Sequence, residues 1–129
     1  MTKQEILDGN KLIAEFMQVK IKENFHKLFY YSDQPFYYVD GKSREEVLNK
    51  ASSYFKYHLS WDWLMPVVEK IELQSKDLFG AYEDCIINGC GFMVPVPDFN
   101  ISIAEVSKIA AVYVGVLKYI EWYNSQKEK

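Results

Sequence analysis

The sequence predicts a small α+β fold in which helices pack on an antiparallel sheet. Three observations support this: apolar residues at helical spacing at both ends of the chain, aromatic strand-like segments within residues 21–39, and a hairpin pattern at residues 85–94. A length of 129 residues suits one layered domain, which we predict over residues 1–129. A chain of this size buries enough apolar surface to fold without a disulfide or metal.

The first predicted helix begins after Thr2 and ends near Val19. Thr2 and Glu5 form a capping-box pattern, in which each side chain satisfies a free amide of the first turn. Strands are then expected within residues 21–39 around a turn at 32–35, because aromatic residues favour pleated surfaces and Asp and Pro favour turns.

Two further segments complete the first half of the chain. Ser43 with Glu46 predicts a short helix through about Ser52, and residues 54–59 predict a strand. A second long helix then follows, capped by Ser60 or Asp62, with Pro66 in its first turns. Its apolar positions are Leu64, Val67, Val68 and Ile71.

The hairpin is predicted from Asn88-Gly89, the dipeptide that favours a type I′ turn. In that register Ile87 lies opposite Cys90 and Cys85 lies opposite Phe92. The two cysteines are then diagonal neighbours, so no direct disulfide is expected. Pro95 and Pro97 are expected to break or edge the sheet.

The last helix is predicted from a capping-box pattern at Ser102 and Glu105. Its apolar residues then recur at spacings of three and four: Val106, Ile109, Ala110, Tyr113, Leu117 and Ile120.

Composition and charge narrow the classes of function. The longest apolar run, residues 109–117, is well below the roughly 20 residues of a membrane span, and no secretory pattern is visible at Met1. A soluble, cytoplasmic protein is therefore expected. A net charge of −3 argues against broad electrostatic binding to nucleic acid or to an anionic membrane.

Residues 9–17, 57–72, 107–113 and 120–124 resemble a known group of proteins. The most distinctive part is Trp-Asp-Trp-Leu-Met-Pro at residues 61–66. The segments resemble small uncharacterised proteins encoded by phages and prophages of gut bacteria, akin to the phage ABA sandwich domain. The resemblance implies an α-β-α sandwich and a phage-related or mobile-element origin. It carries over no catalytic residue.

The candidate ligand- or partner-binding residues are Tyr57, His58, Trp61, Asp62 and Trp63. Aromatic rings stack on bases and anchor protein interfaces. His58 and Asp62 would suit acid–base chemistry if one helical turn carried both. In the alternative interpretation, His58 ends a strand, Asp62 caps a helix and the tryptophans pack in the core.

Metal and cofactor chemistry is not predicted. The only candidate zinc ligands of the usual types are Cys85, Cys90, His58 and His26, without a Cys-x2-Cys pair. No phosphate-binding glycine loop and no nucleophile elbow is present in the sequence.

The leading hypothesis is therefore a non-enzymatic phage-type accessory protein that binds a protein or a small ligand. A homodimer is one form of it, in which the last helix buries Trp122 and Tyr123. One alternative is an enzyme acting on a nucleotide or metabolite through His58 and Asp62. Another is a weak nucleic-acid binder that uses the aromatic hairpin with Lys20, Lys22 and Lys27.

Overall fold

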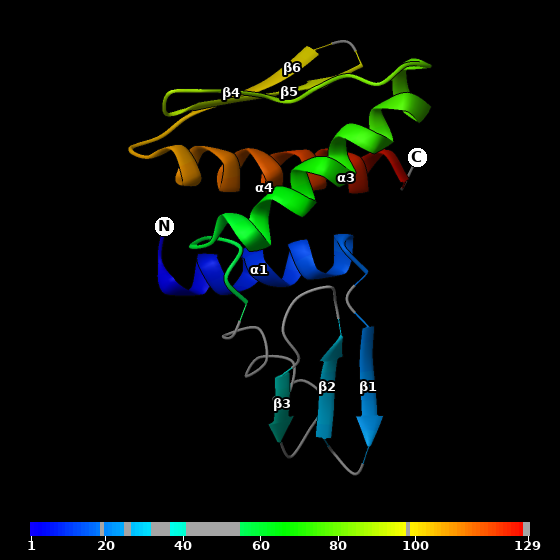
Figure 1. Ribbon diagram of the computed structural model, residues 1–129, viewed down its shortest axis with the longest axis vertical. Helices are drawn as coiled ribbons and strands as arrows, with labels where there is room; N and C mark the ends of the chain where they lie inside the picture. Colours follow the sequence, from blue (N-terminus) through cyan, green and yellow to red (C-terminus); the bar gives the residue numbers. More distant parts are fainter. Residues whose placement is uncertain (19, 25–26, 32–36, 41–54, 98, 128–129) are drawn as a thin grey trace. The chain divides into compact units, whose positions relative to one another are not determined.

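A computed structural model describes residues 1–18, 20–24, 27–31, 37–40, 55–97 and 99–127 (Figure 1). The chain divides into two compact units, Met1–Lys56 and Tyr57–Lys129. Helices and antiparallel strands together confirm the predicted α+β class, with a helix packed against a sheet in the second unit. The single domain predicted over residues 1–129 stays a prediction.

The first unit begins with α1 (Lys3–Phe16), which the predicted capping box starts. The Thr2 hydroxyl accepts the Glu5 amide at 3.1 Å, and the Glu5 carboxylate accepts the Thr2 amide at 3.1 Å. The helix ends earlier than predicted because Gln18 adopts a φ of 56°, in the left-handed region. Asn10 is buried and its Nδ2 donates to the Phe55 carbonyl at 3.2 Å.

The predicted strands of the first unit are present as β1 (Lys20–Asn24), β2 (Lys27–Tyr31) and β3 (Tyr37–Asp40). They form an antiparallel sheet in the order β1-β2-β3. The predicted turn at 32–35 and the predicted helix at 43–52 lie outside the described residues.

The second unit opens with a turn at residues 57–59, so the strand predicted over 54–59 is wrong for the part that is described. A strand needs a neighbour for its backbone groups, and here the chain instead turns into α3 (Trp61–Phe79). Ser60 is the N-cap residue, without a side-chain capping bond, and Asp62 lies inside the first turn. Gly80 ends the helix with a φ of 79°, as left-handed C-caps require.

The second sheet consists of β4 (Ile86–Asn88), β5 (Gly91–Val96) and β6 (Phe99–Ala104), in the order β4-β5-β6 and antiparallel throughout. β5 ends just before Pro97, as predicted, and the predicted edge position, rather than a break, is found for Pro95. It lies in β5 beyond the end of β4, where β5 has β6 as its only described neighbour, so the missing amide hydrogen is tolerated.

The hairpin register differs from the prediction by two residues. Ile87 lies opposite Phe92, and Gly89-Cys90 forms the turn in place of Asn88-Gly89. Only Gly89 has a positive φ, 59°, which fits a turn of type II′ rather than type I′. A shift of two keeps the same side chains on the buried face, so the core pattern permits both registers. Both cysteines are free.

The last helix, α4 (Lys108–Lys127), begins later than predicted. The Ser107 hydroxyl accepts the Ala110 amide at 3.2 Å and provides the cap. The predicted capping box at Ser102 and Glu105 is wrong, because Ser102 belongs to β6 and lies opposite Met93. Val106 accordingly precedes the helix and is fully exposed.

The core of the second unit lies around α4, which contacts all three strands on one side and α3 on another (Figure 1). Gly115 permits the close approach to the sheet, since a Cβ there would overlap the Phe92 ring. Two-sided packing explains why α4 buries a wide arc: Ala111, Val112, Tyr113, Gly115, Val116, Leu117, Tyr119 and Ile120. In the described ranges, none of the helices has the length and apolar character needed to cross a membrane.

Candidate functional site

Two of the five predicted site residues belong to the interior. Tyr57 and Trp63 are 2% and 5% exposed, and their rings meet edge to face with centroids 5.1 Å apart. Burial raises the pKa of Tyr57 to about 12, so its hydroxyl stays protonated at neutral pH. These two rings fix the turn at 57–59 against the start of α3, and a ligand-binding role for them stays a prediction.

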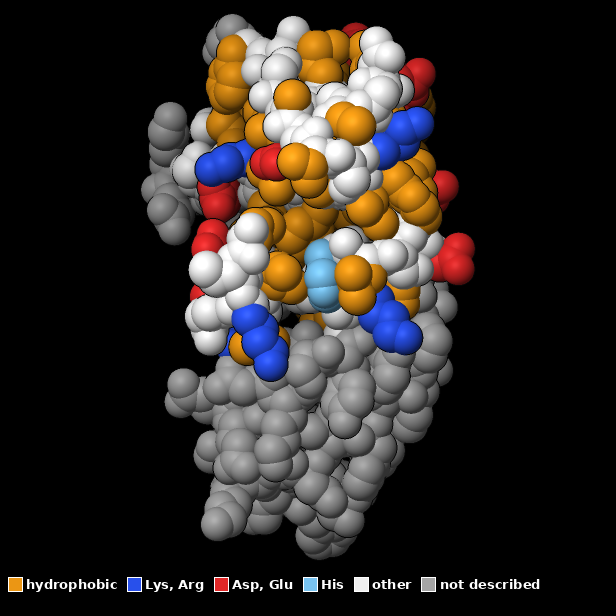
Figure 2. All heavy atoms as spheres, turned by 90° about the vertical axis from the view of Figure 1, so that its left-hand side faces the viewer, with side chains coloured by type: hydrophobic (Ala, Val, Ile, Leu, Met, Phe, Trp, Pro, Cys, Tyr) orange, Lys and Arg blue, Asp and Glu red, His pale blue; other side chains and the backbone are white. Residues whose placement is uncertain are grey.

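His58 lies at the surface beside them. Its imidazole contacts the ring of Tyr113 on α4, with centroids 6.0 Å apart. Figure 2 shows the histidine side chain between hydrophobic side chains on this face. Partial burial lowers the pKa of His58 below its usual 6.5, so the neutral imidazole prevails at pH 7.

Trp61 and Asp62 complete the predicted set, and both are exposed in the first turn of α3. Leu59 in the preceding turn is exposed as well. Asp62 is suited to stabilising the positive end of the helix dipole. The structure thus divides the predicted set into a buried pair, Tyr57 and Trp63, and a surface group formed by the other three residues.

A second group of aromatic residues gathers where α4 ends and β6 begins. Phe99 and Trp122 meet edge to face at 6.5 Å between centroids, and Tyr119 touches Trp122 at 5.8 Å and stacks on Tyr123 at 6.0 Å. Tyr119 is buried, Trp122 and Tyr123 are half-buried, and Phe99 is 52% exposed. We call Phe99, Trp122 and Tyr123 the aromatic surface.

The aromatic surface has a rigid base and a basic margin. The Tyr119 hydroxyl donates to Gln74 Oε1 on α3 at 2.8 Å, which fixes the ring beneath Trp122 and Tyr123. The Lys127 ammonium lies 4.7 Å from the centroid of the Tyr123 ring. Burial and the charge of Lys127 lower the pKa of Lys70 on α3, which places a second cation near this margin.

The sequence indicated part of this surface. Trp122 and Tyr123 follow an apolar helical stripe and are predicted from it as the contact residues of a homodimer. Phe99 was missed because it reaches Trp122 only through the pairing of β6 with β5 and the packing of α4 on both.

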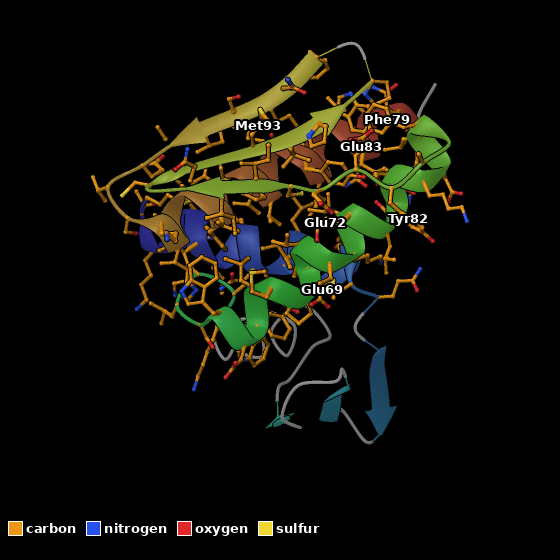
Figure 3. The ribbon with its side chains drawn as sticks, turned by 45° about the horizontal axis from the view of Figure 1, so that its top comes forward. Glu69, Glu72, Phe79, Tyr82, Glu83 and Met93 are labelled. Carbon is orange, nitrogen blue, oxygen red and sulfur yellow. The ribbon has the colours of Figure 1, made fainter. Side chains whose placement is uncertain are left out.

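Polar side chains in the second half of α3 bind the chain that follows the helix; Figure 3 labels Glu72 on α3 and Glu83 beyond its end. Glu72 Oε2 accepts the Cys85 amide at 2.9 Å, and the buried Ser75 hydroxyl accepts the Glu83 amide at 2.7 Å. Burial, reinforced by the Glu72 and Asp84 charges, raises the pKa of the Cys85 thiol to about 12. The thiol is thus protonated and weakly nucleophilic at neutral pH.

Metal binding and nucleic-acid binding are the two remaining kinds of site that the sequence raises. Within the described ranges, no group of three or more His, Cys, Asp or Glu side chains has the arrangement of a metal site. The side chains of Lys20, Lys22 and Lys27 lie outside the described part of the chain, so nucleic-acid binding there stays a prediction.

A comparison of the chain with protein-family models, curated proteins and solved structures gives no significant match.

Proposed function

We propose that this protein is a non-enzymatic binding module that recognises another protein through the aromatic surface. The observation that carries the proposal is the cluster of Phe99, Trp122 and Tyr123, which keeps large apolar rings half-exposed on a rigid base. Tyr and Trp are the residues most enriched among the energetic anchors of protein interfaces. A phage or prophage accessory role belongs to the same proposal and rests on the sequence resemblance of residues 57–72.

The geometry supports recognition rather than catalysis at this place. Tyr119 is held by its bond to Gln74, so a partner that docks on Trp122 meets a base that is already ordered. Such pre-organisation reduces the entropic cost of association. Lys127 near Tyr123 supplies a positive charge at the margin of the rings.

The chemistry of the surface also indicates the kind of partner. Apolar rings beside Lys127 are complementary to an apolar protein patch with a carboxylate at its edge. We therefore expect the contribution of Lys127 to weaken with added salt, and the contribution of Trp122 to persist.

A site-specific crosslinking experiment tests the proposal. A photoreactive phenylalanine analogue replaces Trp122 in the full chain, and the same analogue replaces Leu73 on α3 as a control. Leu73 is 63% exposed and makes none of the ring contacts of the aromatic surface. The expected result is one or a few defined adducts from position 122 in the native host, competed by added wild-type protein.

Two results would contradict the proposal. Equal adduct patterns from positions 73 and 122 would show that the surface has no selectivity. Added Trp122→Ala protein that competes for these adducts as efficiently as wild type would show that the Trp122 ring makes no contribution to partner binding.

A further inference from the structure

Phe99 at the start of β6 belongs to the aromatic surface, but the outer backbone edge of this strand has no role in the proposed function. In the described residues β6 pairs with β5 alone, so its other edge is open (Figure 1). The strand Phe99–Ala104 has the sequence FNISIA, without a charged residue or a proline. Proteins usually protect an open edge with charges, proline or a bulge, because exposed backbone groups pair with other strands.

The hydrogen-bond pattern shows which backbone groups face outward. The Glu105 amide donates to the Cys90 carbonyl at 3.1 Å, which makes these two residues a hydrogen-bonded pair. Such pairs alternate along an antiparallel ladder, so Ile103 and Ile101 direct their amides and carbonyls towards β5. The amides and carbonyls of Asn100, Ser102 and Ala104 therefore point to the open edge.

We propose that two copies of this chain pair along β6 in antiparallel orientation and join their three-stranded sheets into one. The two-fold axis passes beside Ser102, which lies opposite Ser102 of the second copy, and Asn100 lies opposite Ala104. This register pairs every outward amide and carbonyl of the three residues. It also places Ile101 opposite Ile103 on the face that α4 covers, so apolar side chains meet apolar side chains.

The position of α4 independently supports a second copy as the occupant. The helix contacts β5 and β6 to a similar extent, so its axis lies above the space between them. With neighbouring strands about 4.8 Å apart, the axis of α4 lies about 5 Å from the two-fold axis of the dimer. The two α4 helices then lie about 10 Å apart, which is the upper end of normal helix packing. The same two-fold rotation thus pairs the outward backbone groups of β6 and brings the two α4 helices into contact.

A symmetric partner also fits the chemistry of the edge. A strand that is its own complement in register, apolar face and lack of charge satisfies the self-matching condition of an isologous dimer. A strand from a different protein could also pair with β6, but it would bring no second α4 to pack against the α4 of this chain.

Sedimentation velocity of the full chain is the first measurement. The expected species has twice the 15.2 kDa chain mass. Ser102→Pro removes the outward amide at the axis but no bond to β5, and it is expected to give the monomer. Ser102→Ala keeps the amide and is the matched control, expected to remain a dimer. A monomeric wild type, or a dimer that survives Ser102→Pro, would overturn the proposal, and a monomeric wild type would leave foreign strands as the edge's partners.

A disulfide trap tests the register and does not depend on the proline variant folding. Both variants are made with Cys90→Ser, because Cys90 is exposed. Opposed residues of a hydrogen-bonded pair have Cα atoms about 5.5 Å apart, so Ser102→Cys is expected to form a covalent dimer on mild oxidation. The two Asn100 residues are separated by about 13 Å along the ladder, so Asn100→Cys is expected not to crosslink. Equal crosslinking of both variants would overturn the register.

Dimer formation and the proposed function can be separated experimentally. Lys127→Glu alters the margin of the aromatic surface and leaves the β6 edge unchanged. It is expected to reduce capture of the partner protein while the sedimentation of the dimer stays that of wild type. Loss of the dimer in Lys127→Glu would contradict the assignment of the interface to β6.

Discussion

The two faces of the β4–β6 sheet differ sharply although their residues alternate along the same strands. Phe92, Val94 and Val96 of β5 are buried beneath α4, whereas the intervening Met93 and Pro95 are half-buried. Opposite Met93, Ser102 is exposed. The difference shows that stability in the second unit comes from one face of the sheet, and that the other face and the β6 edge are available for contacts.

The largest effect on stability is expected from truncating a side chain on the buried face of the sheet. Phe92→Ala is expected to reduce the free energy of unfolding by about 3–5 kcal/mol, because the lost ring leaves a cavity against α4. Met93→Ala, one residue along on the other face, is expected to cost about 1 kcal/mol because its side chain is only partly removed from water. Urea denaturation of both variants measures the difference, and equal losses would contradict the assignment of faces.

Overfilling the same contact gives the next largest effect. Alanine has a higher helix propensity than glycine by about 1 kcal/mol, so Gly115→Ala would stabilise an exposed helix. Here the new methyl group overlaps the Phe92 ring, and a net loss of about 1–3 kcal/mol is expected. Phe92→Leu combined with Gly115→Ala should recover part of that loss in a double-mutant cycle. A stabilised Gly115→Ala single variant would show that the helix and sheet are not in close contact.

A smaller effect is expected where the chain enters the sheet. Ser75→Ala leaves the Glu83 amide without its acceptor, and a loss of about 1–2 kcal/mol is expected. Glu83→Ala keeps that amide bond and serves as the control, expected near wild type because its side chain is exposed. Thermal denaturation of the two variants compares them directly. Equal transition temperatures would mean that the Ser75 bond contributes nothing.

The smallest effect concerns the opposite side of α4, where His58 contacts Tyr113. Burial holds the pKa of His58 below its usual 6.5, so the folded state binds the proton less readily than the unfolded state. Stability is therefore full above pH 6.5 and declines as the pH falls through the lower, folded-state pKa. His58→Gln should flatten the unfolding free energy between pH 7 and pH 5 relative to wild type. An unchanged slope in the variant would assign the pH dependence to other groups.

Local signals in the sequence were sufficient for several elements. The Thr2–Glu5 capping box and the stripe of α1 depend only on neighbouring residues, and both are present. The apolar positions of α3 and the strands within residues 21–39 were likewise predicted from local spacing and residue type. In these segments the side chains that decide the structure are separated by only a few residues in the sequence.

Where a local sequence pattern fits two structures, contacts with residues distant in the sequence select one of them. Ser102 fits a capping box as well as a strand, and its pairing with Met93 selects the strand. Asn88-Gly89 and Gly89-Cys90 are both acceptable turns, and the register that places Ile87 opposite Phe92 selects the second. Neither choice is visible from the segment alone, because each depends on a partner strand.

The candidate sites follow the same division. Residue type alone identified Trp61, Trp122 and Tyr123 as possible contact residues, because large aromatic side chains dominate interfaces as well as cores. Only the tertiary structure separated the buried Tyr57 and Trp63 from the exposed rings, since burial depends on which elements pack above a residue. The open edge of β6 likewise exists only once β5 has taken the other side of the strand. The sequence by itself determined the helical stripes, the cap of α1 and the fold class, and the packing of α4 on the sheet decided which surfaces remain for binding.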